Sequence, residues 1–258
     1  MSGIKTEHHQ GVLKITLSRP EKFNSFNREM ALALQHVLDK AAQDKKTRCV
    51  YLTGEGKAFC AGQDLSEAVD DNGPGIERIV REHYNPIIEK IRSLEKPVVC
   101  AVNGVAAGAG ANIALACDVV VAGNSVSFIQ AFSKIALIPD SGGTYFLPRL
   151  VGFGKASALM MLGDKVAAGE AERMGMIYKV VADDSLQEEA YAIAKTLSEL
   201  PTKAIGLTKR LLNQSMFNTL DKQLEYEADT QVHAATSSDY TEGVKAFLEK
   251  RKAVFSGE

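Results

Sequence analysis

The chain has 258 residues, enough to bury a sizeable core in one large domain or in one domain with a helical appendage. Its net charge of -2 gives no general attraction to phosphate backbones, so we do not expect nucleic acid as a partner. No run of about 18 apolar residues occurs, and the N-terminus lacks the apolar segment of a signal peptide. We therefore expect a cytoplasmic protein that does not span a membrane.

The pattern of the first half favours alternating strands and helices. Alternating residues predict an antiparallel strand pair at Ile4–His9 and Val12–Leu17. Ser25 is the predicted N-cap of the helix that follows. The remaining predicted elements are a strand at 49–53, a helix at 76–93, a strand at 98–102, a helix from about 107 and a strand at 119–122. This alternation is typical of an α/β fold.

The second half reads differently. Beyond about Gly142 the sequence predicts few strands apart from one at 178–181, and the last 70 residues have the pattern of amphipathic helices. The four cysteines show no CxxC spacing and stand mostly in apolar runs, which favours buried free thiols. The five histidines show no ligand spacing either. The sequence therefore predicts no metal site.

Two turns of small residues follow predicted strands, one at 59–65 and one at 103–112. Such turns let a ligand approach the backbone and leave N–H groups at a helix start unpaired, which suits an oxyanion; close helix packing explains the second turn equally well. A dinucleotide site is disfavoured because Ile113 stands where the third glycine would be. The turns are about 45 residues apart, and because each follows a predicted buried parallel strand, we expect them to converge at the carboxyl ends of neighbouring strands.

Asp140 stands alone in the segment 138–144, before a helix predicted to begin near Ser141. It is either a structural residue, as the N-cap of that helix or as a turn residue, or an acid/base group. Its apolar neighbours Leu137, Ile138 and Phe146 would raise its pKa toward a useful range. The local sequence alone favours the structural role, as a cap or turn residue.

The segments 59–65, 96–110 and 138–144, in this order, resemble the enoyl-CoA hydratase/isomerase (crotonase) superfamily, and the similarity runs from Leu17 nearly to the C-terminus. The resemblance implies an α/β fold with a crotonase-like ββα spiral core over residues 1–195, which binds acyl-CoA and catalyses the reaction. It also implies a C-terminal helical trimerisation region over 196–258 and assembly as a trimer or a dimer of trimers. The expected partner is an acyl-CoA thioester, with no cofactor beyond the coenzyme A of the substrate.

The resemblance also assigns site residues. The amides of Ala61 and Ala109 would hold the thioester oxygen, while Lys22, Lys250 and Lys252 are candidates for the CoA phosphates unless they are merely solvated. The other residues expected to line the substrate are Gly62, Gln63, Asp64, Leu65, Gly108, Gly110, Asn112 and Phe132.

Two departures from the hydratase pattern decide the expected reaction. The glutamates that activate water in hydratases fall here on Asn112 and Phe132, and neither side chain can act as a base. Asp140, in contrast, occupies the position at which several isomerases of the family, and the chlorobenzoyl-CoA dehalogenases, carry an Asp. The resemblance therefore implies an isomerase in which Asp140 shuttles a proton.

The segments 128–145, 220–224 and 239–248 resemble the family members that convert the ring epoxide of phenylacetyl-CoA to oxepin-CoA in phenylacetate degradation. Three alternatives stay open. They are an enoyl-CoA hydratase of fatty-acid degradation, a Δ3-Δ2-enoyl-CoA isomerase, and a non-catalytic acyl-CoA-binding or RNA-associated protein.

Overall fold

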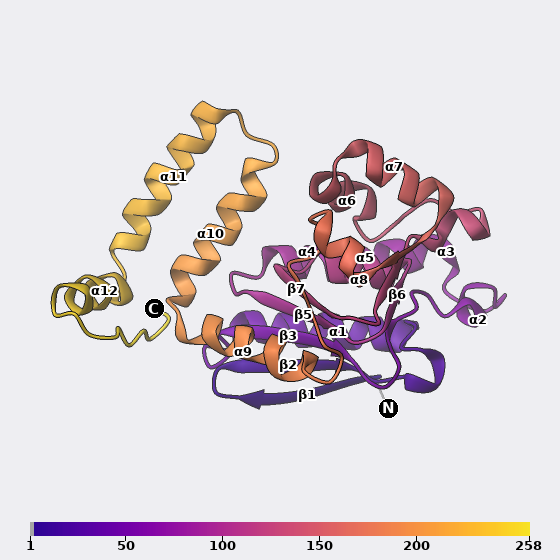
Figure 1. The fold of residues 1–258 in the computed structure, drawn as a ribbon, viewed down its shortest axis with the longest axis horizontal. Helices are drawn as coiled ribbons and strands as arrows, with labels where there is room; N and C mark the ends of the chain where they lie inside the picture. Colours follow the sequence, from indigo (N-terminus) through magenta and orange to yellow (C-terminus); the bar gives the residue numbers. More distant parts are fainter. Residues whose placement is uncertain (1–2) are drawn as a thin grey trace.

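The computed structural model describes residues 3–258 and contains two sheets (Figure 1). The larger has six strands in the order β1 (Ile4–His9), β2 (Val12–Leu17), β3 (Cys49–Gly54), β5 (Val98–Val102), β7 (Val119–Gly123) and β10 (Lys179–Val181). Only the β1–β2 pair in this sheet is antiparallel among the described strands. The smaller sheet has the order β4 (Ala58–Cys60), β6 (Val105–Ala107), β8 (Ser127–Ile129) and β9 (Lys165–Ala167).

Helices lie between and after the strands. They are α1 (Arg28–Gln43), α2 (Leu65–Ala68), α3 (Gly75–Arg78), α4 (Asn85–Ser93), α5 (Ala109–Leu115), α6 (Gly143–Val151), α7 (Phe153–Leu162), α8 (Ala168–Arg173), α9 (Leu186–Glu199), α10 (Thr202–Ser215), α11 (Leu220–Ala235) and α12 (Ser238–Leu248). Two 3-10 turns, η1 (Pro20–Lys22) and η3 (Ala131–Ile135), and one π-helical segment, η2 (Ile79–Tyr84), complete the described elements.

The central strand β3 is buried on both faces, which is why its sequence is largely apolar. Because side chains of a strand alternate between the faces, Val50 and Leu52 join the core that includes α1, whereas Cys49 and Tyr51 join the core that includes α9. The sheet is therefore a middle layer between helices, as expected for an α/β fold.

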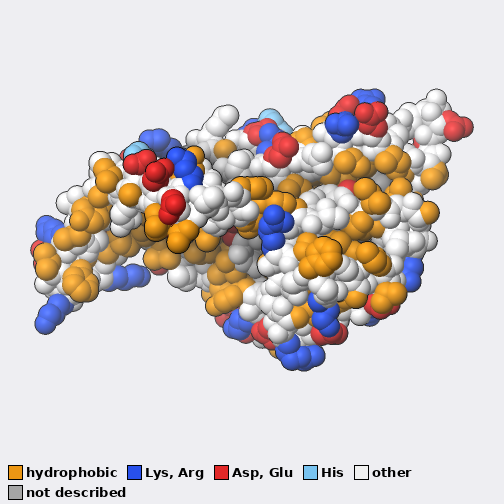
Figure 2. Space-filling view, turned by 90° about the horizontal axis from the view of Figure 1, so that it is seen from above, with side chains coloured by type: hydrophobic (Ala, Val, Ile, Leu, Met, Phe, Trp, Pro, Cys, Tyr) orange, Lys and Arg blue, Asp and Glu red, His pale blue; other side chains and the backbone are white. Residues whose placement is uncertain are grey.

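Helices α10, α11 and α12 form an arm that projects from the body of the molecule (Figure 1). Large apolar side chains on the arm are exposed, and Figure 2 shows hydrophobic side chains along it and where it meets the body. The most exposed of them include Phe217, Leu220, Val232, Phe247 and Leu248. None of the described helices is long and apolar enough to cross a membrane.

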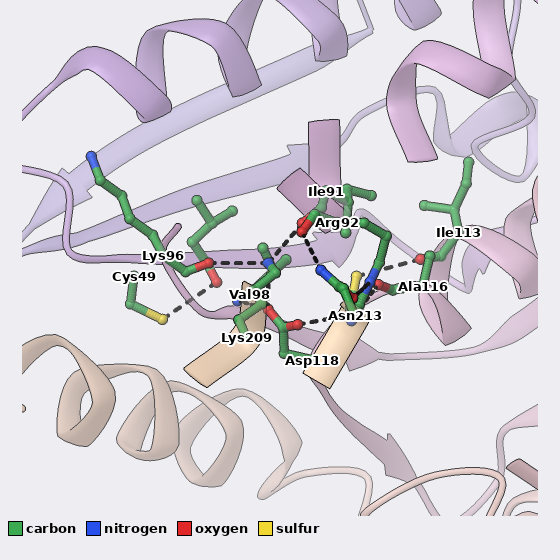
Figure 3. A network of polar contacts seen from close by, with 12 residues as sticks. Cys49, Ile91, Arg92, Lys96, Val98, Ile113, Ala116, Asp118, Lys209 and Asn213 are labelled. Carbon is green, nitrogen blue, oxygen red and sulfur yellow. Dashed lines mark hydrogen bonds and ion pairs between the residues drawn. The ribbon is translucent and has the colours of Figure 1, made fainter. Parts of the chain in front are cut away.

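A polar network fastens the first helix of the arm to the body (Figure 3). The buried Lys209 of α10 lies 2.7 Å from the Asp118 carboxylate and donates to the carbonyls of Ile91 and Lys96 at 2.7 and 3.2 Å. Asp118 also accepts from the Val98 N–H at 2.8 Å. The ammonium of α10 is thereby bound to both α4 and the start of β7.

Several element boundaries differ from the prediction. The N-cap of α1 is Asn27, whose side chain accepts from the Met30 N–H at 3.0 Å, so the predicted cap at Ser25 is wrong. The helix predicted over 76–93 contains the π-helical segment η2 in its middle. Sequence periodicity missed β8 and β9 because three residues are too few to show an alternation. The four cysteines are free and buried, as predicted.

Candidate active site

The two small-residue turns follow neighbouring strands, as the sequence predicts, but these strands belong to the smaller sheet. Strand β4 pairs with β6 in parallel, so the residues that follow each strand lie side by side. Gly62 has φ +93°, and a Cβ there would lie 3.0 Å from the Ala107 carbonyl oxygen and 3.5 Å from the Ala109 nitrogen. Only glycine fits this position, because it tolerates the left-handed backbone and leaves room for the opposite turn.

The Ala61 amide does not face this junction. Its N–H donates to the Phe23 carbonyl at 3.0 Å, so the amide expected to hold a ligand is already paired within the protein. The backbone amide of Gln63, two residues further along the chain, has a different environment. Phe26 bonds to the residues on either side of Gln63, donating to Gly62 at 2.7 Å and accepting from Asp64 at 2.8 Å.

This pairing directs the Gln63 N–H away from Phe26, because successive residues of an extended strand alternate their amides between its two edges. The Gln63 N–H has no acceptor in the described part of the chain. We therefore take the backbone amide of Gln63, instead of the Ala61 amide, as the candidate donor to a ligand. Local sequence patterns do not indicate this, since the strand-like pairing joins residues far apart in the chain.

Ala109 is the first residue of α5, so its N–H is one of the helix-start donors that have no partner within the helix. The glycines on either side of it have different tasks. Gly108 has φ +52°, and a Cβ there would lie 3.7 Å from the buried ring of Phe132. Gly110 presses against β4, where a Cβ would approach the Cys60 carbonyl oxygen to 2.4 Å. Gly108 and Phe132 thus flank the Ala109 amide, and Gly110 brings the helix onto the strand.

Asp140 lies in the loop between η3 and α6. The residues that follow it, Ser141 and Gly142, both have left-handed backbones (φ 51° and 71°), and the N–H of Gly143 donates to the Asp140 carbonyl at 2.9 Å. The cap residue of α6 is Gly142, and no side chain caps this helix. The interpretation of Asp140 as a helix cap is therefore wrong, whereas the alternative that it is a turn residue agrees with the Gly143 hydrogen bond, which closes a turn that begins at Asp140.

The Asp140 carboxyl accepts from the Ser141 hydroxyl at 2.9 Å, and two of the apolar neighbours predicted for it, Leu137 and Ile138, are exposed. Burial raises its pKa above the ordinary 3.8, and the Ser141 hydrogen bond opposes the shift without cancelling it. A carboxyl with a raised pKa suits proton transfer near neutral pH.

Asn112 is fully buried on α5, and its side chain contacts the backbone of Asp140. Its Nδ2 donates to the Asp140 carbonyl at 2.9 Å, and its Oδ1 accepts from Gln130 Nε2 at 2.8 Å. The helix that begins with the Ala109 amide therefore also holds the loop that carries Asp140. Two amide N–H groups and one carboxyl of raised pKa can stabilise an oxyanion and move a proton.

A family model described as Enoyl-CoA hydratase/isomerase matches residues 7–258 of the chain. The chain belongs to this family. A 1,2-epoxyphenylacetyl-CoA isomerase of Escherichia coli (strain K12) is 47% identical over 261 residues, covering all of both chains. A probable enoyl-CoA hydratase of Rhodobacter capsulatus is 43% identical and covers 98% of each.

Among solved structures, a putative enoyl-CoA hydratase/isomerase from Mycobacterium abscessus matches with a TM-score of 0.94 at 38% identity, covering 99% of this chain and 100% of the other. The predicted membership of the enoyl-CoA hydratase/isomerase family, the crotonase fold and the enzyme class are thereby confirmed.

In this enoyl-CoA hydratase/isomerase the side chains of Tyr84 and Glu67 hold the Gln63 side chain through hydrogen bonds. The Tyr84 hydroxyl, at the end of η2, donates to Gln63 Oε1 at 2.8 Å, and Gln63 Nε2 donates to the Glu67 carboxylate at 3.0 Å. Burial raises the pKa of Tyr84, and nearby Cys60 and Asp140 add to the effect. Tyr84 is therefore a neutral donor that lies within electrostatic reach of Asp140.

The remaining predicted residues of this enoyl-CoA hydratase/isomerase are dispersed. Asp64 pairs with Arg19 at 2.9 Å and caps α2, which gives it a structural task, and Leu65 is half exposed. Lys22 precedes Phe23, whose carbonyl binds the Ala61 amide. Lys250 and Lys252 follow α12, which lies away from α5 and α6 (Figure 1), and the Lys252 ammonium is 3.6 Å from the Glu199 carboxylate at the end of α9, so one chain does not bring them to Asp140.

Proposed function

We propose that the protein isomerises an acyl-CoA thioester, converting 2-(1,2-epoxy-1,2-dihydrophenyl)acetyl-CoA to oxepin-CoA. The observation that carries the proposal is a single carboxyl of raised pKa, Asp140, beside two turns that supply backbone amides. The 47% identity to a 1,2-epoxyphenylacetyl-CoA isomerase supports the choice of substrate.

In the proposed mechanism the N–H groups of Gln63 and Ala109 bind the thioester oxygen. Loss of a proton from the carbon next to the thioester makes an enolate, whose charge grows on this oxygen. A preplaced N–H donor is often worth about 3 kcal/mol to such a transition state. Asp140 accepts the proton and returns it to the same molecule, so one acid/base group suffices for the isomerisation.

Asn112 and Phe132 support isomerisation over hydration. Both are buried, and neither side chain ionises in the range where a base would activate water. Phe132 lies against Gly108, beside the Ala109 amide, where an apolar ring reduces the access of water. At the two positions where the two-glutamate route of hydration needs carboxylates, this chain has an amide and an apolar ring.

We further propose that the CoA part binds at the outer end of the 59–65 turn, with Lys22 as the candidate for its phosphates. Lys22 lies on η1, directly before the Phe23 carbonyl that binds Ala61. The exposed apolar side chains of the arm support self-association as a trimer or a dimer of trimers. In such an assembly Lys250 and Lys252 of one subunit are candidates for contacts with the CoA of another.

The test is Asp140→Asn, which keeps the size of the side chain and removes its acid/base capacity. We expect the rate of epoxide turnover to fall by about 10²- to 10⁴-fold with little change in KM. The matched control is Asp184→Asn, since Asp184 is exposed and accepts from the next serine in the same way (3.3 Å). Turnover in deuterated water would show in addition which carbon exchanges its proton.

The control should retain wild-type kinetics. If Asp140→Asn kept more than about a tenth of the wild-type turnover with unchanged substrate binding, Asp140 would not be the acid/base group.

A further inference from the structure

Two neutral amide side chains form a directed chain that ends on the loop of Asp140. A backbone carbonyl can only accept, so the nitrogen of Asn112 must face the Asp140 oxygen, and the Asn112 oxygen must face the nitrogen of Gln130. The orientation of both amides follows from this one contact. Gln130, which is 3% exposed, lies at the outer end of the chain.

This hydrogen-bonded chain of Gln130 and Asn112 leaves one buried polar atom unpaired. Once its nitrogen is committed to Asn112, the buried Oε1 of Gln130 has no hydrogen-bond partner among residues 3–258. A buried unpaired oxygen is unfavourable and calls for an explanation. The surroundings of Asn112 are also tight, because a Cβ on Gly143 would lie 2.3 Å from Nδ2. Donation from Asn112 to Asp140 is the one task of this chain that touches the acid/base residue.

The contact between Asn112 and Asp140 lies where the loop before α6 is held by two hydrogen bonds. The Asp140 carbonyl accepts from both Asn112 Nδ2 and the Gly143 N–H, each at 2.9 Å. Beyond it the backbone turns through two left-handed residues, Ser141 and Gly142. Since the carbonyl and the side chain of Asp140 leave the same Cα region, fixing the one restricts the position of the other.

We propose that Asn112, supported by Gln130, is a positioning residue that holds Asp140 in reach of the substrate carbon. The inference rests on the proposed role of Asp140. An ionised acid at position 112 would remove the donor to the Asp140 carbonyl and put a negative charge in its place. The amide that replaces the hydratase glutamate therefore has a task of its own, which makes position 112 specific for the isomerase reaction.

Asn112→Asp tests the proposal with a nearly isosteric change. The new carboxylate oxygen would face the Asp140 carbonyl where Nδ2 now donates. We expect kcat to fall by about 10²-fold, since a misplacement of about 1 Å costs that much, with KM changed much less. The acid limb of the kcat/KM profile should move to higher pH, because a second carboxylate disfavours ionisation of Asp140.

The matched control is Asn213→Asp. Asn213 also donates through Nδ2 to a backbone carbonyl at 2.9 Å, that of Arg92, but lies in the network of Figure 3. It should leave kcat and the pH profile unchanged. Unchanged kcat and pH profile in Asn112→Asp would overturn the proposal.

Gln130→Met keeps the test decisive if Asn112→Asp does not fold. It removes the donor to Asn112 Oδ1 without adding charge, so we expect about a 10-fold loss of kcat and an unshifted acid limb. A wild-type kcat in this variant would show that the hydrogen bond from Gln130 to Asn112 does not help to position Asp140. If Asp140→Asn remained active, the proposed function would fail, whereas an inactive Asp140→Asn with a fully active Asn112→Asp would refute only the positioning role.

Discussion

At the scale of single residues, Gly62 is the position where backbone conformation and close approach coincide. Any side chain there meets the Ala107 carbonyl at 3.0 Å and must adopt φ +93°. Since Gly62 precedes the Gln63 amide, Gly62→Ala should displace this donor and lower kcat by about 10²-fold. Steady-state kinetics on the epoxide thioester would measure the effect.

The control for that variant is Gly152→Ala. Gly152 has φ +79° but nothing within 4 Å of its added Cβ, so the substitution carries the same backbone strain without a collision. Both variants should lose some stability, and only Gly62→Ala should lose turnover. Equal kcat values in the two variants would remove Gly62 and the adjacent amide from the mechanism.

Asp140 should make the stability of the protein depend on pH. Its pKa is raised in the folded state above 3.8, so the folded protein binds this proton more tightly than the unfolded chain does. The stabilisation is complete below about 3.8 and is lost as the pH rises through the folded pKa. Asp140→Asn should therefore be more stable than the wild type at neutral pH and equally stable near pH 3.5.

Denaturant titrations of both proteins across this range would measure the difference in the free energy of unfolding. A variant no more stable than the wild type at neutral pH would mean that the folded protein does not disfavour the charged carboxylate.

The sequence predicted these site residues unequally. Asp140 was identified through the resemblance, because its local pattern was that of a cap. The Gln63 amide was missed, since its direction depends on pairing with Phe26 across 37 positions of the chain. Ala109 was also named through the resemblance, whereas the local pattern predicted only a helix start after small residues, which leaves its amides free.

At the scale of elements, the interior of the body was predictable and its departures from regularity were not. The large-sheet strands follow from apolar runs and alternation, and the predicted antiparallel pair β1–β2 has the expected bounds. The π-helical segment η2 leaves no mark in the periodicity. It ends at Tyr84, which contacts Gln63, so the irregular element lies beside the site.

The attachment of α10 depends on charge rather than on apolar packing alone. Lys209 is buried and bonded to Asp118, and the Lys209 side chain is only 7% exposed. Lys209→Met should leave Asp118 without its closest cation and lower the free energy of unfolding by about 3 to 5 kcal/mol. Thermal or denaturant unfolding monitored by circular dichroism would show the loss.

The comparison is Lys45→Met, which breaks an ion pair of similar length, 2.8 Å against 2.7 Å, with Glu258 on the surface. Both partners are largely exposed there, so the variant should unfold like the wild type. A Lys209 variant as stable as this control would show that the network of Figure 3 is not needed to hold the arm.

At the scale of the whole molecule, the arm is the feature that a single chain leaves unexplained. The helices were predictable from their periodicity, but their projection from the body depends on which apolar faces find partners within the chain. The expected division at residue 195 stays a prediction; this residue lies within α9, which packs on the large sheet.

The exposed arm predicts that self-association depends on its apolar side chains. Phe247, on α12, is 82% exposed, and Leu248 beside it is 74% exposed, which is unfavourable for a lone subunit in water. Phe247→Glu should shift the protein toward smaller species in sedimentation velocity while its circular dichroism stays that of the wild type. Tyr178→Glu is the control, since Tyr178 is 68% exposed but lies on the body, after α8.

If lysines after α12 bind the CoA of a neighbouring subunit, Phe247→Glu should also raise KM more than it lowers kcat, because Asp140 and both amides stay in place. Wild-type sedimentation of Phe247→Glu would mean that this part of the arm lies outside the subunit contacts, and the exposed apolar side chains would then need another partner.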